Sequence, residues 1–224
     1  MNPIIVALDV ENAAQARQLV QRLGPAADFY KVGLELYAAA GMDFVRELIG
    51  DGKQVFLDLK FYDIGETVKR AVAQVAAVEG IRFLTVHAHP TVMRAAREGK
   101  RDSPLQLLAV TVLTSWTGRD LADDGHAGSV AELVARRVTN ARDCQMDGLI
   151  CSPLEVARVR EIAGPAAILV TPGVRSVGAD TGDQKRVATP AMAIRHGANY
   201  LVMGRQISRA TDPAAEMQRI LSEL

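Results

Sequence analysis

Residues 54–60 read Gln-Val-Phe-Leu-Asp-Leu-Lys, an apolar run that ends in charged side chains. Near-continuous hydrophobicity of this kind is typical of a strand that is buried on both faces, as in a parallel sheet. Similar short runs recur along the whole chain, at residues 4–9, 29–33, 82–87, 105–113, 148–151, 167–171 and 200–204. The sequence therefore predicts eight buried strands.

Longer amphipathic stretches separate these runs, with apolar residues at three- and four-residue spacing. Examples are residues 12–23, 66–78, 129–142 and 153–162. In the last of these, Ser152 is expected as the N-cap and Pro153 as the first helical residue. Alternating strands and helices without a composition break predict an α/β fold, a (β/α)8 TIM barrel, with residues 1–224 as a single domain. An open flavodoxin-like sheet is the alternative, but it would normally use fewer strands.

The charge balance excludes several classes of partner. Lys plus Arg and Asp plus Glu both number 26 in 224 residues, so the formal net charge is zero. There is no excess of basic residues to bind a nucleic-acid backbone and no polybasic run to bind a membrane surface. No apolar stretch is long enough to suggest a transmembrane helix. Cys144 and Cys151 make no disulfide framework, and no signal peptide is visible. We expect a cytoplasmic protein without nucleic-acid or membrane partners, and any anion that it binds should be small.

Charged residues at the ends of the predicted strands mark the expected active site, because TIM barrels place their chemistry at the carboxyl ends of the strands. Asp58 and Lys60 are two residues apart, so their side chains share one face of a strand, and Asp63 follows as the chain turns toward the next helix. Two carboxylates around one ammonium should keep Lys60 protonated and ready to act as a general acid. The alternative is a structural ion pair at the barrel rim.

Asp9 and Lys31 stand near the ends of the first two predicted strands. Together they could grip sugar hydroxyls. Asp9 could instead lie near the N-cap of the first helix, although Asn12 is available for that role. Lys31 could be a rim lysine whose stem packs on apolar surface while its ammonium reaches water.

A phosphate site is expected after the seventh and eighth strands, as in many TIM barrels. Gly204 would let a backbone N–H approach a phosphate, and Arg205 would add a bidentate charge. Residues 173–190 form a long loop, rich in glycine, in which Gln184 could close over the same group. The alternative is a surface loop with a solvated arginine.

The pair His87 and His89 raises the question of a metal, because both rings could share a face. A zinc or iron site would need at least one more well-placed ligand, so histidines lining the core or the substrate are favoured and no metal is expected. Trp116 and His126, in the polar loop after the fifth strand, receive no role.

With these residues in place, the chain resembles the orotidine 5′-phosphate decarboxylase family along its whole length. The resemblance is carried by residues 7–9, 31–33, 58–64, 86–88, 112–115, 170–175 and 203–205. The motif Asp-x-Lys-x-x-Asp at residues 58–63 is its most specific part. One departure is visible: the family often continues this motif as Ile-Pro-Asn-Thr, whereas here Gly65 and Glu66 precede Thr67.

The resemblance implies loss of CO₂ from orotidine 5′-phosphate to give UMP, without a cofactor. Asp58 would lie beside the substrate carboxylate, and Lys60 would protonate the carbon that loses it. Asp63 and Thr67 resemble residues that are donated across the interface of a homodimer. The remaining contacts would be Asp9 and Lys31 to the ribose, Thr114 to the pyrimidine, and Arg175, Gln184, Gly204 and Arg205 to the phosphate.

Three other functions fit parts of the pattern. Metal-dependent sugar-phosphate decarboxylases and synthases share the Asp-x-Lys-x-x-Asp motif, but they place a metal-binding Glu where Lys31 stands. A Schiff-base aldolase would need a depressed pKa at Lys60, and flanking carboxylates have the opposite effect. A non-catalytic phosphate-binding barrel would not need all of the charged residues that stand at the ends of the strands.

Overall fold

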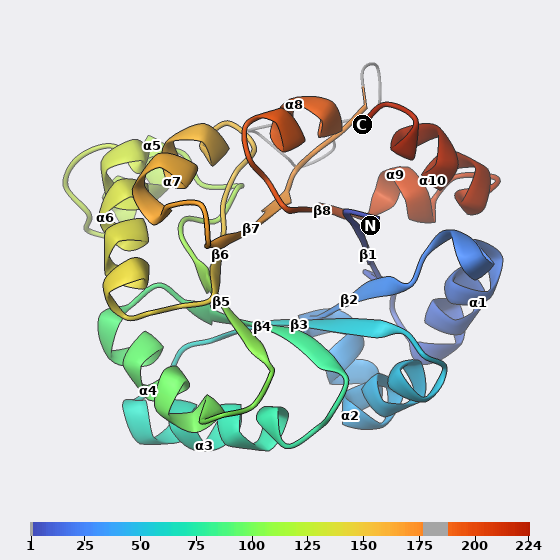
Figure 1. Cartoon of the computed structure of the whole chain (residues 1–224), viewed down its shortest axis with the longest axis horizontal. Coiled ribbons are helices and arrows are strands. Elements are labelled where there is room, and N and C mark those ends of the chain that lie inside the picture. The colour runs from blue at the N-terminus through green and yellow to red at the C-terminus, as the bar shows by residue number, and fades with distance from the viewer. Residues whose placement is uncertain (1, 177–187) are drawn as a thin grey trace.

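The computed structural model describes residues 2–176 and 188–224, in which eight parallel strands close into a barrel in sequence order and helices surround it (Figure 1). The strands are β1 (Ile4–Ala7), β2 (Phe29–Gly33), β3 (Gln54–Phe61), β4 (Ile81–His87), β5 (Gln106–Val110), β6 (Gly148–Ile150), β7 (Ile168–Pro172) and β8 (Tyr200–Met203). The predicted (β/α)8 barrel is confirmed, and β8 closes it by pairing with β1.

The helices alternate with the strands as the sequence predicts. They are α1 (Ala13–Leu23), α2 (Leu34–Gly50), α3 (Gly65–Ala76), α4 (Pro90–Lys100), α5 (Gly118–Asp123), α6 (Val130–Asp143), α7 (Val156–Ala163), α8 (Pro190–Arg195), α9 (Arg205–Ser208) and α10 (Pro213–Leu221), with a short 3-10 turn at Gly24–Ala26. Asn12 caps α1 by accepting a hydrogen bond from the Gln15 N–H. Within the described residues, no helix is both long and apolar enough to span a bilayer.

The expected start of the seventh helix is wrong. α7 begins at Val156, and Ser152 is not its N-cap. Residues 153–155 form a turn instead, closed by a hydrogen bond from the Glu155 N–H to the Ser152 carbonyl. The Ser152 hydroxyl is buried with no partner among the described residues, so it is turned away from the N–H groups that an N-cap would bind.

Aromatic rings fill the interior of the barrel below the carboxyl ends of the strands. Phe29, Phe83 and Tyr200 pack with ring centroids 5.3–5.8 Å apart, and Phe56 stands edge-on to Phe83. The guanidinium of Arg82 lies over three of these rings, 5.1–5.4 Å from their centroids. The barrel is therefore a packed core, and a ligand can enter only from the carboxyl ends of the strands.

Candidate active site

Four charged side chains form an alternating row at the mouth of the barrel. The ammonium of Lys31 lies 2.8 Å from Asp9 Oδ1 and 3.7 Å from Asp58 Oδ2. The other oxygen of Asp58 accepts a hydrogen bond from Lys60 Nζ at 2.8 Å. Period-two alternation explains the placement, because Lys31, Asp58 and Lys60 follow inward-facing phenylalanines on β2 and β3. The row thus brings two ammonium groups and two carboxylates together at the carboxyl ends of the strands.

Asp58 lies between the two ammonium groups of this row, and 16% of its side chain is exposed. Burial by itself raises the pKa of its carboxyl, but the charges of Lys31 and Lys60, with hydrogen bonds from Lys60 and Thr85, act the other way. The net result is a pKa below the usual value for aspartate. Asp58 is therefore an anion at neutral pH, and one of its oxygens accepts the hydrogen bond from Lys60 Nζ.

Thr85 on β4 completes this arrangement, and the sequence reasoning missed it. Its hydroxyl lies 3.0 Å from the Lys60 backbone nitrogen and 3.0 Å from Asp58 Oδ1. Its position carried a signal, since Thr85 is two residues from the inward-facing Phe83 and therefore falls on the inner face of β4.

Gly33 was missed as well. A Cβ atom at this position would lie 2.8 Å from Lys31 Nζ and 3.3 Å from Asp9 Oδ1. Real Cβ atoms essentially never approach another atom to under 3.0 Å. A Cβ here would require the flexible end of the Lys31 side chain to shift, so glycine leaves the room in which the Lys31–Asp9 pair takes this geometry above β2.

A cavity of about 760 Å³ opens over this row. Its lining includes these residues that the sequence singled out: Asp9, Lys31, Asp58, Lys60, Thr114, Arg175, Gly204 and Arg205. In the closed eight-stranded order, β3 and β7 are four strands apart, so Lys60 and Arg175 approach the cavity from opposite sides of the barrel. The cavity can thus hold a molecule that has a reacting group at one end and an anionic group at the other.

Arg175 and Arg205 supply the positive charge on the side of β7 and β8. Arg175 is buried, and its backbone N–H donates to the Ala188 carbonyl at 3.0 Å. Gly204 precedes α9, and a Cβ there would make only ordinary contacts with Ala7 and Asp9. Gln184, the remaining residue expected at this site, lies outside the described residues.

Asp63 and Thr67 do not line this cavity. Both are exposed, and the carboxylate of Asp63 accepts a hydrogen bond from the Ile64 N–H at 2.7 Å. Their neighbours Tyr62 and Ile64 are also exposed, at 65% and 73%. The segment between β3 and α3 thus presents two large apolar side chains to solvent.

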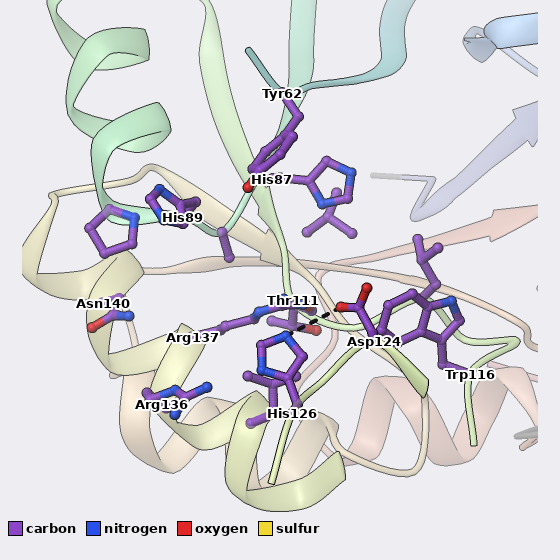
Figure 2. Close-up of a pocket in the computed structure, with 15 residues that line it drawn as sticks. Tyr62, His87, His89, Thr111, Trp116, Asp124, His126, Arg136, Arg137 and Asn140 are labelled. Atoms are coloured by element: carbon purple, nitrogen blue, oxygen red, sulfur yellow. Dashed lines mark hydrogen bonds and ion pairs between the residues drawn. The ribbon is translucent and has the colours of Figure 1, made fainter. Parts of the chain in front are cut away.

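A second cavity, of about 450 Å³, lies beside the first at the ends of β4 and β5. Figure 2 shows Tyr62 and His87 on one side of it, and the ion pair between Asp124 and His126 on the other. Trp116 lines this second cavity as well. The lining thus includes both Trp116 and His126, to which the sequence analysis assigned no role. The described residues contain no group of three or more His, Cys, Asp or Glu side chains that could hold a metal.

His87 lines the second cavity and lies near the charges of Arg137 and Lys60. Burial, with the positive charges of Arg137 and Lys60, lowers the pKa of its imidazole. The ring is therefore neutral at neutral pH, and it packs edge-on against Tyr62 at 5.3 Å between centroids. This observation agrees with the expectation of a histidine that lines the core or the substrate.

Comparison with known proteins identifies the family. A sequence model described as the orotidine 5′-phosphate decarboxylase / HUMPS family matches residues 2–220. The chain belongs to this family. An orotidine 5′-phosphate decarboxylase of Methylobacterium sp. (strain 4-46) is 50% identical over 224 residues, covering 99% of this chain and 94% of the relative. Its counterpart in Bradyrhizobium sp. (strain ORS 278) is 51% identical over 221 residues, covering 99% and 90%.

Solved structures agree with this membership of the orotidine 5′-phosphate decarboxylase family. The crystal structure of orotidine 5′-phosphate decarboxylase from Lactobacillus acidophilus superposes with a TM-score of 0.88 at 37% identity, covering 100% of this chain and 99% of that one. An uncharacterized conserved protein from Geobacillus kaustophilus gives 0.85 at 33% identity, covering 99% of both chains. The resemblance seen in the sequence motifs is confirmed.

The departure from the family motif at Gly65 and Glu66 falls on the first turn of α3. A Cβ at Gly65 would make an ordinary contact with Ala95, and Glu66 pairs with Arg70 on the surface at 3.1 Å. Neither residue lines the cavity over Lys60. Within this decarboxylase family the exchange therefore changes the helix surface rather than the charged row.

Proposed function

We propose that this protein decarboxylates orotidine 5′-phosphate to UMP in pyrimidine biosynthesis, without a cofactor. Relatives at about 50% identity that are named orotidine 5′-phosphate decarboxylase support the proposal. The observation that carries the proposal is the Lys60 ammonium, held 2.8 Å from Asp58 in a cavity that also contains Arg175 and Arg205. A cation at one end and two guanidinium groups at the other match a substrate with a carboxylate on its ring and a remote phosphate.

In the proposed reaction, the bond between the pyrimidine carbon and its carboxylate breaks, CO₂ leaves, and the electron pair remains on the carbon. Lys60 then transfers one proton from Nζ to that carbon and regains a proton from solvent. The fixed ammonium stabilises the negative charge as it develops, which is a preorganised electrostatic contribution. Asp58, an anion in a buried place, lies beside the substrate carboxylate and favours its loss.

The residues that line the cavity support the other contacts of the proposal. Asp9 and Lys31 hold the ribose hydroxyls, and Thr114 contacts the pyrimidine. Arg175, Gly204 and Arg205 bind the phosphate, and the family resemblance alone assigns Gln184, which lies outside the described residues, to the same group. Binding energy from this remote phosphate helps to orient the reacting carbon against Lys60.

The protein acts as a homodimer with shared active sites, in which Asp63 and Thr67 of one subunit complete the cavity of the other. Two features support this assembly: the exposed Tyr62 and Ile64, and the position of Asp63 just beyond the motif that contains Lys60. A twofold dimer would cover both apolar side chains and form two composite sites. As an enzyme of nucleotide biosynthesis, it is expected in the cytoplasm.

The alternatives are not favoured. A metal-dependent sugar-phosphate decarboxylase needs a ligand where Lys31 stands, and Lys31 is instead a cation paired with two carboxylates. A Schiff-base aldolase needs a neutral Lys60, whereas this ammonium is hydrogen bonded to a buried anion. A passive phosphate-binding barrel would have no use for a row of four alternating charges, of which Lys31 is buried and Asp58 mostly so.

Purified protein tests the proposal directly. Conversion of orotidine 5′-phosphate, followed by ultraviolet absorbance in excess EDTA, should proceed at the same rate as without chelator. Absence of conversion would refute the decarboxylase assignment. Activity that is lost in EDTA and restored by Mg²⁺ would move the protein to the sugar-phosphate branch.

A further inference from the structure

The pairing between β3 and β4 is interrupted at the charged row. Leu57 pairs with Leu84 and Phe61 with Val86, so three residues of β3 stand opposite Thr85 alone. Lys60 adopts a positive φ of 48° within this bulge, a backbone conformation that residues with a side chain disfavour. The surrounding structure must hold Lys60 in this conformation.

The Thr85 hydroxyl makes two hydrogen bonds at this point. The Lys60 N–H can only donate, so the hydroxyl accepts from it at 3.0 Å. The single hydroxyl hydrogen is then directed to Asp58 Oδ1 at 3.0 Å, and this same oxygen accepts from Lys60 Nζ at 2.8 Å. One hydroxyl thus joins the backbone of Lys60 to the carboxylate that orients its side chain.

Burial makes this hydroxyl hard to replace. Thr85 has 0% exposure, and it faces into the barrel above Phe83. The buried threonines Thr111 and Thr171 are on the opposite face of their strands, since it is Val110 and Val170 that belong to the interior cluster. Among these three, only Thr85 is therefore placed to contact the charged row.

We propose that Thr85 is a positioning residue, whose hydroxyl holds Lys60 in its disfavoured backbone conformation and keeps Asp58 aligned with the Lys60 ammonium. This inference rests on the proposed function, in which Lys60 delivers a proton to carbon. The hydroxyl itself is not required to touch the substrate. Its loss should therefore impair the chemical step more than substrate binding.

Two pairs of variants isolate the hydroxyl. The first pair is the wild type and Thr85→Val, which removes the hydroxyl at nearly constant shape. The second pair is Thr85→Ser and Thr85→Ala, which differ by the hydroxyl in a smaller side chain. In each pair, the protein without the hydroxyl should have a kcat about ten- to a hundredfold lower, as expected when a hydrogen bond to a charged group is lost. KM should change by less than about twofold, because the lost interaction acts in the transition state. Thr85→Ser should restore most of the wild-type kcat.

The pH dependence of kcat/KM gives a readout that a purely structural role would not move. A donor to Asp58 favours its charged form, so removing the donor raises the pKa of this carboxyl. The acid limb of the profile should therefore shift to higher pH in Thr85→Val and Thr85→Ala, and should remain in place in Thr85→Ser.

Thr171→Val is the matched control, because it alters a fully buried strand threonine that faces the helices. It should retain wild-type kcat and the wild-type acid limb.

Lys60→Ala, measured in parallel, separates the two hypotheses. If the wild type does not convert orotidine 5′-phosphate, the proposed function fails, and if Lys60→Ala retains turnover, the proton-donor role of Lys60 fails and the role of Thr85 fails with it. If Lys60→Ala is inactive but neither hydroxyl pair differs in kcat by more than about twofold, only the role of Thr85 is refuted. A loss confined to KM would refute it equally.

Discussion

The ammonium of Lys31 lies 2.8 Å from Asp9 Oδ1, although the two residues are 22 positions apart in the chain. Gly33 leaves the space in which this pair forms. The pair is the proposed ribose contact, so the backbone at Gly33 links the geometry of β2 to substrate recognition. A small substitution at Gly33 can test this link without removing either charge.

Gly33→Ala should lower kcat/KM by about tenfold, since displacing one charge-assisted contact costs roughly 1.5 kcal/mol or more. The added methyl would lie within 2.8 Å of Lys31 Nζ and force the ammonium away from Asp9. Steady-state kinetics with orotidine 5′-phosphate measures the effect. Gly50→Ala is the control, because a Cβ there meets nothing within 4 Å. Equal kinetics in the two variants would show that the Lys31–Asp9 pair adjusts to a methyl group at position 33 without loss of activity.

Lys60→Ala should remove nearly all turnover, by about 10²- to 10⁴-fold or more, because a general acid contributes this much. Calorimetry should still detect binding of UMP, since the cavity near Arg175 and Arg205 is unchanged. Borohydride reduction of the wild-type protein with substrate should trap no adduct. A covalent adduct on Lys60 would mean that the lysine acts as a nucleophile rather than as a proton donor.

Arg205→Ala should impair decarboxylation of the phosphorylated substrate far more than that of orotidine itself. Loss of a bidentate, charge-assisted contact should cost roughly 2–4 kcal/mol in kcat/KM for the phosphorylated substrate alone. The comparison requires only the two substrates and one variant. Equal losses on both would show that Arg205 does not hold the phosphate.

Lys60→Ala and Asp63→Ala test the shared active site when they are mixed. Each variant alone should be nearly inactive. After subunit exchange, one site of each heterodimer carries both substitutions and the other carries neither. Activity should return to at most about half of wild type in a pure heterodimer.

Each variant incubated alone is the control for this mixing experiment, and size-exclusion chromatography with a tagged subunit confirms exchange. If exchange occurs and activity does not return, Asp63 acts within its own chain. The exposed Tyr62 and Ile64 would then need another explanation.

The sequence predicted the barrel well because parallel strands buried on both faces are continuous apolar runs, against which charged strand ends stand out. Asp58 and Lys60 were found in this way. Thr85 and Gly33 were missed because their roles depend on a bulge and on a close approach between strands. Threonine is also an ordinary residue in a strand, so nothing in its identity marks it.

Other residues required information that a single chain does not contain. In the proposed homodimer a second copy of the protein would place Asp63 and Thr67, so their role stays a prediction. The start of α7 was misplaced for a different reason. Ser-Pro is a good helix-start signal, but residues 153–155 form a turn, the Ser152 hydroxyl caps no N–H group, and α7 begins only at Val156.

The positive φ of Lys60 implies a trade-off between stability and activity. Glycine would tolerate this backbone best, but glycine has no ammonium. Lys60→Gly should therefore be more resistant to denaturant than Lys60→Ala, by about 1 kcal/mol, because a Cβ in the left-handed region costs more than the added freedom of glycine in the unfolded chain. An alanine variant of equal or greater stability would contradict this. If this difference is found, the need for an ammonium at position 60 makes the protein less stable than the bulge would allow. Variants selected for stability alone should then lose Lys60 first.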